Sequence, residues 1–169
     1  MTGGREAEVE EAEVTETAPE IRRRITVVMP TFEHESFVRC AIESLLAQSL
    51  DAWRLVVDDD GSPDDTTAVV EPYLVDPRIA YVRLPENEGL GRALNVGLDL
   101  AETDLIAYLP SDDHYFQDHL AGVVDCLDRH PKAAMAVSGV RRHKETAAAA
   151  PPGEPPQLVQ TAHRRTSDR

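Results

Sequence analysis

The chain has 169 residues, of which 41% are hydrophobic, and this length and composition fit one globular domain. Its formal net charge of −14 argues against nucleic acid as the main partner. No run of residues is long and apolar enough to span a membrane, and the acidic N-terminus lacks the apolar core of a signal peptide. We therefore expect a cytoplasmic protein without an integral membrane segment.

The two ends of the chain differ from its middle in composition. Residues 1–24 begin as a Glu-, Ala- and Thr-rich stretch and close on three arginines, which predicts an acidic disordered tail with a basic hinge. Residues 141–169 contain an Ala- and Pro-rich stretch followed by a short polar segment, which is typical of a linker and tail. Residues 25–140 are predicted to form the folded domain.

From Ile25 onward, strand and helix patterns alternate. Ile25–Met29 is a β-branched run ended by Pro30, as a buried strand would be. Apolar residues at helical spacing follow between residues 37 and 46. Trp53–Val57 predicts a second strand, and Asp64-Asp65 opens a helix that Pro72 is expected to break or kink.

The second half of the domain continues the alternation. Ile79–Leu84 predicts a third strand, and Gly89–Leu100 has the apolar spacing of a third helix. Leu105–Leu109 predicts a fourth strand, Phe116–His130 a fourth helix, and Ala133–Val137 a fifth strand. The two cysteines, Cys40 and Cys126, fall within helical patterns and are interpreted as buried structural thiols.

This order predicts an α/β fold, an open and mostly parallel sheet with helices on both faces. Right-handed crossovers place every strand-to-helix loop at one edge of the sheet, where α/β proteins bind ligands. The loops that meet there are Pro30–Glu35, Asp58–Asp65, Pro85–Gly91 and Pro110–Tyr115.

Two of these loops carry acidic clusters, Asp58-Asp59-Asp60 and Asp112-Asp113. Neighbouring carboxylates repel each other unless a cation or a hydrogen-bonding ligand lies between them. The clusters therefore predict a site for a metal-bound, phosphorylated ligand. We assign function to Asp59 and Asp60, and expect Asp58 to be simply exposed. A helix cap is an alternative role for the second cluster. The histidines His34, His114 and His119 are interpreted as surface residues.

Five segments, in order, resemble the family 2 glycosyltransferases, which have the GT-A fold. They are Val27–Phe32, Ala41–Gln48, Val57–Thr66, Asn87–Gly97 and Tyr108–Asp113, and the resemblance runs from about Ile25 to Val140. It implies a Rossmann-like sheet that binds a nucleotide-diphospho-sugar donor and transfers the sugar to an unknown acceptor, a glycan, lipid or protein. Family analogy favours inverting chemistry.

The resemblance also implies residue roles. Pro30, Thr31 and Phe32 would lie along the nucleoside, and Asp59 or Asp60 would accept a hydrogen bond from the base. The wall near the nucleotide would be shaped by Asn87, Gly89, Gly91 and Arg92. Asp112 and Asp113 would face the ribose and a divalent cation, Mg²⁺ or Mn²⁺, since both ions prefer oxygen ligands and leave positions open for phosphate oxygens.

The chain departs from the family pattern at three places. Pro110 stands where the family often has an acidic residue two before Asp112, and Glu33 stands where it often has Asn. The third departure is length, because after Val140 the sequence has no counterpart of the C-terminal half that supplies the acceptor site and the catalytic base. The resemblance thus implies a donor-binding half, truncated and inactive in one reading.

Two other functions fit parts of the sequence. The run from Val56 to Ser62 also matches the strand motif of haloacid-dehalogenase-like phosphatases, with Asp58 as nucleophile and Asp60 as acid/base, although that motif normally lies on the first strand. The missing second half favours a non-catalytic nucleotide-sugar-binding module instead.

Overall fold

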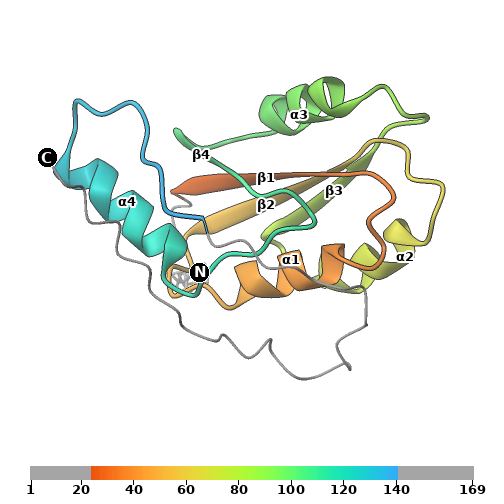
Figure 1. Ribbon diagram of the computed structural model, residues 1–169, viewed down its shortest axis with the longest axis horizontal. Helices are drawn as coiled ribbons and strands as arrows, with labels where there is room; N and C mark the ends of the chain where they lie inside the picture. The colour runs from red at the N-terminus through yellow and green to blue at the C-terminus, as the bar shows by residue number, and fades with distance from the viewer. Residues whose placement is uncertain (1–23, 141–169) are drawn as a thin grey trace, which may run out of the picture. The chain divides into compact units, whose positions relative to one another are not determined.

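The computed structural model describes residues 24–140, and the acidic tail, linker and polar tail lie outside these residues except for Arg24. Four strands form one parallel sheet in the order β3-β2-β1-β4. Their bounds are Ile25–Thr31 for β1, Trp53–Asp59 for β2, Ile79–Arg83 for β3 and Leu105–Tyr108 for β4. The predicted parallel α/β sheet is confirmed (Figure 1).

Helices connect the four strands and cover both faces of the sheet, and one further helix follows the last strand. They are α1 (Val38–Leu46), α2 (Thr66–Val70), the 3₁₀ helix η1 (Glu71–Val75), α3 (Leu90–Asp99) and α4 (His119–Arg129). Figure 1 shows α3 on one face, where it packs against β1 and β2, and α1 and α2 on the other. The break after α2 coincides with Pro72, as predicted, since proline cannot donate an intrahelical hydrogen bond.

The core lies around the two central strands. Every residue of β1 is buried, and so are six of the seven residues of β2, with only Arg54 half-buried. Burial of each large aliphatic side chain contributes about 1.5–3 kcal/mol. The guanidinium of Arg78 lies 4.0 Å from the centre of the Trp53 ring. This cation–π contact lies at the start of β2.

Strand β1 continues past Pro30 to Thr31, two residues beyond the predicted end. Thr31 faces β2, because its carbonyl accepts a hydrogen bond from the Asp60 N–H at 2.9 Å. Neighbouring residues of a strand bond to opposite sides, so Pro30 faces β4, which has already ended at Tyr108. The missing N–H of Pro30 therefore removes no ladder hydrogen bond.

The predicted fifth strand is wrong. Residues 133–137 are neither strand nor helix, and Met135 and Val137 have 74% and 80% of their surface exposed. A strand needs a neighbour to satisfy its backbone N–H and C=O groups, and none of the described strands pairs with this run.

The prediction of buried cysteines is also wrong, since Cys40 and Cys126 are both exposed. In α1 the buried face consists of Val38, Ala41, Ile42 and Leu45, at the spacing of one helical stripe. Cys40 lies outside that stripe. Of the pattern predicted for this helix, Ala41 and Leu45 are buried, whereas Phe37 and Cys40 are exposed.

The chain divides into two compact units, Met1–Ala121 and Gly122–Arg169. The sheet, helices α1 to α3 and all the residues of the candidate site belong to the first unit. The loops that follow β1, β2, β3 and β4 meet at the carboxyl edge of this sheet.

Candidate functional site

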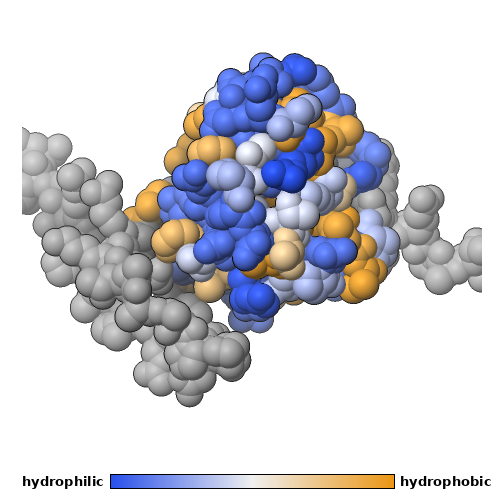
Figure 2. Space-filling model, turned by 90° about the vertical axis from the view of Figure 1, so that its right-hand side faces the viewer, coloured by the Kyte–Doolittle hydropathy of each residue, from blue (hydrophilic) through white to orange (hydrophobic). Residues whose placement is uncertain are grey.

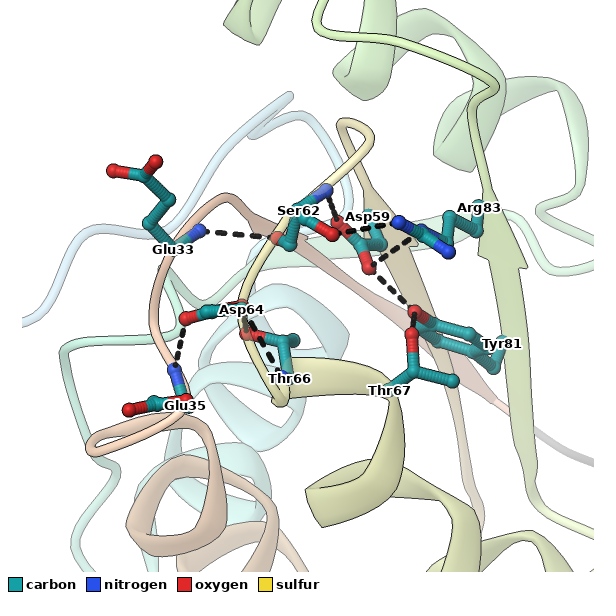
Figure 3. Close-up of polar contacts among 9 residues, drawn as sticks. All are labelled: Glu33, Glu35, Asp59, Ser62, Asp64, Thr66, Thr67, Tyr81 and Arg83. Carbon is teal, nitrogen blue, oxygen red and sulfur yellow. Dashed lines mark hydrogen bonds and ion pairs between the residues drawn. The ribbon is translucent and has the colours of Figure 1, made fainter.

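The three aspartates after β2 have three different environments. Asp59 is fully buried and is held by the protein itself: its carboxylate accepts hydrogen bonds from the Ser62 N–H at 2.8 Å and from the Tyr81 hydroxyl, and it lies 3.7 Å from the Arg83 guanidinium (Figure 3). Burial, and the hydrogen bond to Asp59, raise the pKa of Tyr81 to about 12. Asp59 therefore fixes the turn after β2.

Figure 3 shows a second layer of contacts that fixes the neighbouring loop. The Glu33 N–H donates to Ser62 Oγ at 3.0 Å, and the Glu35 N–H donates to the Asp64 carboxylate at 3.1 Å. Asp64 also accepts from the backbone N–H and the hydroxyl of Thr66 at the start of α2. These bonds tie the loop after β1 to the loop after β2.

Asp58 is buried, with 1% of its surface exposed, and the expectation that it is exposed is wrong. Its side chain faces α3, where a Cβ added to Gly97 would clash with an Asp58 carboxylate oxygen and with Val28. Neither carboxylate oxygen has a hydrogen-bond partner among the described residues. Burial raises the pKa of Asp58 to about 8, and the charge of Asp60 adds to the effect.

The burial of Asp58 bears on the alternative function as a haloacid-dehalogenase-like phosphatase. A nucleophilic aspartate must reach a substrate phosphate, and Asp58 is enclosed by α3 and the sheet instead. The geometry that this mechanism requires is therefore absent at Asp58.

Asp60 connects the end of β2 to the start of α3. Its two carboxylate oxygens accept hydrogen bonds from the Glu88 and Gly89 N–H groups, each at 2.8 Å. Gly89 has φ of 90°, a left-handed conformation that favours glycine, and it directly precedes the first residue of α3. The carboxylate thus positions the loop before α3 and borders the cleft described next.

The fourth strand ends in the turn Pro110–Asp113, which the Asp113 N–H closes by donating to the Pro110 carbonyl at 3.0 Å. Ser111 is buried, and its hydroxyl lies 2.6 Å from Nδ1 of His34 in the loop after β1. Asp112 and Asp113 are both exposed. The pKa of Tyr108, on β4, is raised by burial and by nearby aspartate charges, of which Asp112 contributes most.

A cleft of about 340 Å³ lies at this carboxyl edge, a volume in the range of small-molecule sites. Its lining comes from the ends of β1, β2 and β4 and from the start of α3. The lining residues are Pro30, Thr31, Phe32, His34, Asp60, Asn87, Gly89, Leu90, Ala93, Tyr108, Pro110, Ser111 and Asp112. Figure 2 looks onto this side of the molecule, where hydrophilic residues predominate and apolar ones lie between them.

Most of the residues that the sequence singled out reach the cleft wall. Seven do: Pro30, Thr31, Phe32, Asp60, Asn87, Gly89 and Asp112. Asp59, Gly91, Arg92 and Asp113 are not among its lining residues. The Arg92 guanidinium points to Glu88 instead, with Nε 3.6 Å from the carboxylate.

The structure adds lining residues that the sequence did not single out, above all His34 and Tyr108. His34 was interpreted as a surface histidine and lies on the cleft wall. The only sequence signal for it was its position in a loop after a strand. Tyr108 was assigned to its strand, and a side chain near a strand's carboxyl end can border the ligand edge.

The acidic residues at the cleft are the candidate ligands for a divalent cation. Among residues 24–140, no group of three or more His, Cys, Asp or Glu residues could hold a metal ion. Mg²⁺, however, is typically bound through one or two carboxylates together with substrate phosphates and water. Asp112 on the wall and its exposed neighbour Asp113 fit a cation of that shared kind.

Comparison with known proteins gives a family match over most of the chain. The model described as Glycosyl transferase family 2 matches residues 26–166. Among curated relatives, the succinoglycan biosynthesis protein ExoW of Rhizobium meliloti is 35% identical over 113 residues, which are 63% of this chain and 34% of that protein.

Solved structures give the same result. The crystal structure of S. aureus TarS 1–349 in complex with UDP aligns with a TM-score of 0.61 and 29% identity, over 64% of this chain and 33% of that one. The mannosyltransferase PcManGT from Pyrobaculum calidifontis, in complex with GDP-Man and Mn²⁺, aligns with a TM-score of 0.58 and 27% identity, over 65% of this chain and 34% of that one.

The chain spans 14% to 39% of the length of eight curated relatives that it matches. Within the part of the chain that the structure describes, no helix combines the length and the apolar character needed to cross a bilayer.

Proposed function

The chain belongs to glycosyl transferase family 2, and from that premise we propose that its cleft binds the nucleotide-diphospho-sugar donor of a glycosyltransferase. The sheet and its helices are those of the GT-A fold. The observation that carries the proposal is the cleft at the carboxyl edge, where Asp60 and Asp112 approach from different strand ends. We also propose that residues 25–140 are the donor-binding region.

The nucleoside end of the donor is assigned to the side of the cleft formed by β1, β2 and the start of α3. Pro30, Thr31 and Phe32 offer a wall for the nucleoside, and Asn87 and Gly89 border it. We assign the base contact to Asp60 in preference to Asp59, because Asp60 lies on the wall whereas Asp59 is buried and engaged by Ser62 and Tyr81. A carboxylate can accept a base N–H.

The diphosphate end is assigned to the turn after β4. Asp112 and Asp113 would hold Mg²⁺ or Mn²⁺, and the bound cation would neutralise negative charge on the departing diphosphate. That PcManGT was solved with GDP-Man and Mn²⁺ supports this assignment. For Arg92 to contact the nucleotide, as the family resemblance implies, its guanidinium would have to leave Glu88.

The transfer step itself is proposed on family grounds, as an inverting reaction on a glycan, lipid or protein acceptor. Among the described residues that line the cleft, the carboxylates are Asp60 and Asp112, and both already have donor-side assignments. We therefore assign no catalytic base. A cytoplasmic location stays a prediction.

Calorimetric titration of the 169-residue chain with UDP and with GDP tests the proposal. Binding is expected with Mn²⁺ or Mg²⁺ present, and much weaker binding with EDTA. Asp112→Asn and Asp113→Asn should each weaken metal-dependent binding about tenfold or more, because each replaces an anionic oxygen ligand of the cation by a neutral amide.

The matched control is Asp104→Asn, which removes an exposed carboxylate that is not on the cleft wall. It should leave the dissociation constant unchanged. No binding of either nucleotide with either metal would refute the proposed function.

A nucleotide-sugar-binding module without turnover is a second candidate. It is favoured by the cleft lining, in which the two carboxylates, Asp60 and Asp112, both have donor-side assignments. Donor hydrolysis or transfer by the chain would identify an enzyme, whereas tight binding with no product would identify the module.

A further inference from the structure

The cleft wall lacks the side chains that usually hold a diphosphate. Among its lining residues, all of which the structure describes, there is no Lys and no Arg, and the formally charged ones are Asp60 and Asp112. If the ligand is the nucleotide diphosphate of the proposed function, the wall repels it except where a cation or an N–H donor intervenes. His34 has the one ring on this wall that can supply an N–H.

The ring of His34 is held in place from several sides. Nδ1 lies 2.6 Å from the hydroxyl of Ser111, a fully buried residue. The ring also meets Phe37 edge to face, with centroids 5.8 Å apart. The His34 carbonyl accepts the N–H groups of Phe37 and Val38, each at 3.0 Å, and so joins the loop to the start of α1.

With Nδ1 engaged, the second ring nitrogen remains for a ligand. Nε2 has no hydrogen-bond partner among the described residues, although the ring borders the cleft. When the Ser111 hydroxyl donates to Nδ1, the proton of the neutral ring lies on Nε2, and in the imidazolium both nitrogens carry protons. These two forms present an N–H at Nε2, whereas the neutral tautomer that donates from Nδ1 to Ser111 does not.

We propose that His34 is a donor-binding residue whose Nε2 N–H donates to a phosphate oxygen of the nucleotide diphosphate. The inference rests on the proposed function. The phosphate is favoured over the base because His34 is bonded to Ser111, the direct neighbour of Asp112 in the turn assigned to the diphosphate. The base is assigned to Asp60, which binds the opposite loop at Glu88 and Gly89.

Two substitutions separate ligand binding from a purely structural role. His34→Asn keeps a polar group near the position of Nδ1 and removes Nε2, whereas His34→Gln extends an amide N–H toward the position of Nε2. Each variant is titrated in Mg²⁺ buffer without Mn²⁺, and the chemical shifts are followed. The ligands are UDP and uridine, and GDP and guanosine, so the titrations give the affinity for each diphosphate and for its nucleoside. Thermal unfolding checks that each variant is folded.

For the nucleotide that the unmodified chain binds, His34→Asn should raise the dissociation constant of the diphosphate about tenfold, as expected for loss of a hydrogen bond to a charged group. The affinity for the nucleoside should stay within about twofold. His34→Gln should retain most of the diphosphate affinity. His130→Asn, at a histidine that is not on the cleft wall, should change neither value.

Three results would overturn the inference. The diphosphate affinity of His34→Asn could equal that of the unmodified chain, the nucleoside and the diphosphate could weaken equally, or His34→Gln could lose as much as His34→Asn. Failure of the unmodified chain to bind either diphosphate would instead refute the proposed function, and this inference with it.

Discussion

Glu33 shows how one residue of the first loop is held against its own preference. Its φ of 54° lies in the left-handed region, which costs L-residues about 1–2 kcal/mol, and less for asparagine and glycine. The loop is fixed in this conformation because the Glu33 N–H donates to Ser62 Oγ at 3.0 Å. The departure from the family's usual Asn at this position therefore has a backbone cost.

We predict that Glu33→Asn stabilises the protein by about 0.5–1 kcal/mol, since asparagine adopts the left-handed region more readily and the backbone hydrogen bond is kept. Urea denaturation at neutral pH measures the change. Glu86→Asn serves as the control, because Glu86 is also an exposed glutamate in a loop but is not among the positive-φ residues. A Glu33→Asn variant that is less stable would show that the glutamate side chain contributes more than the strain it causes.

At the level of the elements, Asp58 places a carboxyl group between the sheet and α3. With both oxygens unpaired and Gly97 packed against them, the protonated form is favoured in the folded state, and the pKa of Asp58 is raised to about 8. The unfolded chain has the ordinary aspartate pKa of about 3.9. Between these values the folded state binds one proton more than the unfolded state.

Stability should therefore fall as pH rises from about 4 to about 8, by up to about 1.4 kcal/mol per pH unit from this group alone, and level off above that. Asp58→Asn removes the titration and keeps the size of the side chain. We predict that its stability advantage over the unmodified chain grows from pH 5 to pH 8, measured by urea denaturation at each pH. The comparison cancels the other carboxylates, so parallel curves would contradict the assignment.

Asp58 also shows which feature the sequence pattern did not predict, namely the direction of each aspartate side chain after β2. The run Leu55-Val56-Val57 is buried on both faces of the sheet, so it has no alternation from which the direction of the next side chain could be inferred. Three adjacent aspartates then look equivalent, although one faces α3, one is bonded inside the turn and one borders the cleft. Only the packing of α3 and the folding of the loops distinguish them.

The predicted strands and the role of His34 differ in how far they depend on contacts between distant residues. The four strands of the sheet were predictable because each is a short apolar run bounded by turn residues, and parallel connections place their ends at one edge. Residues 133–137 have a similar composition but no described neighbour with which to pair. The role of His34 depends on contact with Ser111, 77 positions away, which no local pattern encodes.

At the scale of the whole molecule, the charge of −14 opposes folding through mutual repulsion. Ion pairs act against this repulsion, and among the described residues two of them, Arg92 with Glu88 and Arg129 with Asp125, have both side chains exposed. Such pairs contribute about 0–1 kcal/mol each and are weakened by salt. Salt thus acts in opposite directions on the two terms, and the repulsion sums over many more charges than the pairs do.

We predict that added NaCl stabilises the folded chain, by on the order of 1 kcal/mol between 10 and 200 mM, because the Debye length shortens from about 30 Å to below about 10 Å and screens the repulsion. Thermal unfolding at fixed pH, without divalent cations, measures the effect. Choline chloride at equal ionic strength should give the same shift if screening is the cause, since choline does not share the coordination chemistry of Na⁺. A lower melting temperature at higher salt would mean that the exposed ion pairs outweigh the repulsion. It would also mean that the acidic surface is arranged more favourably than its net charge indicates.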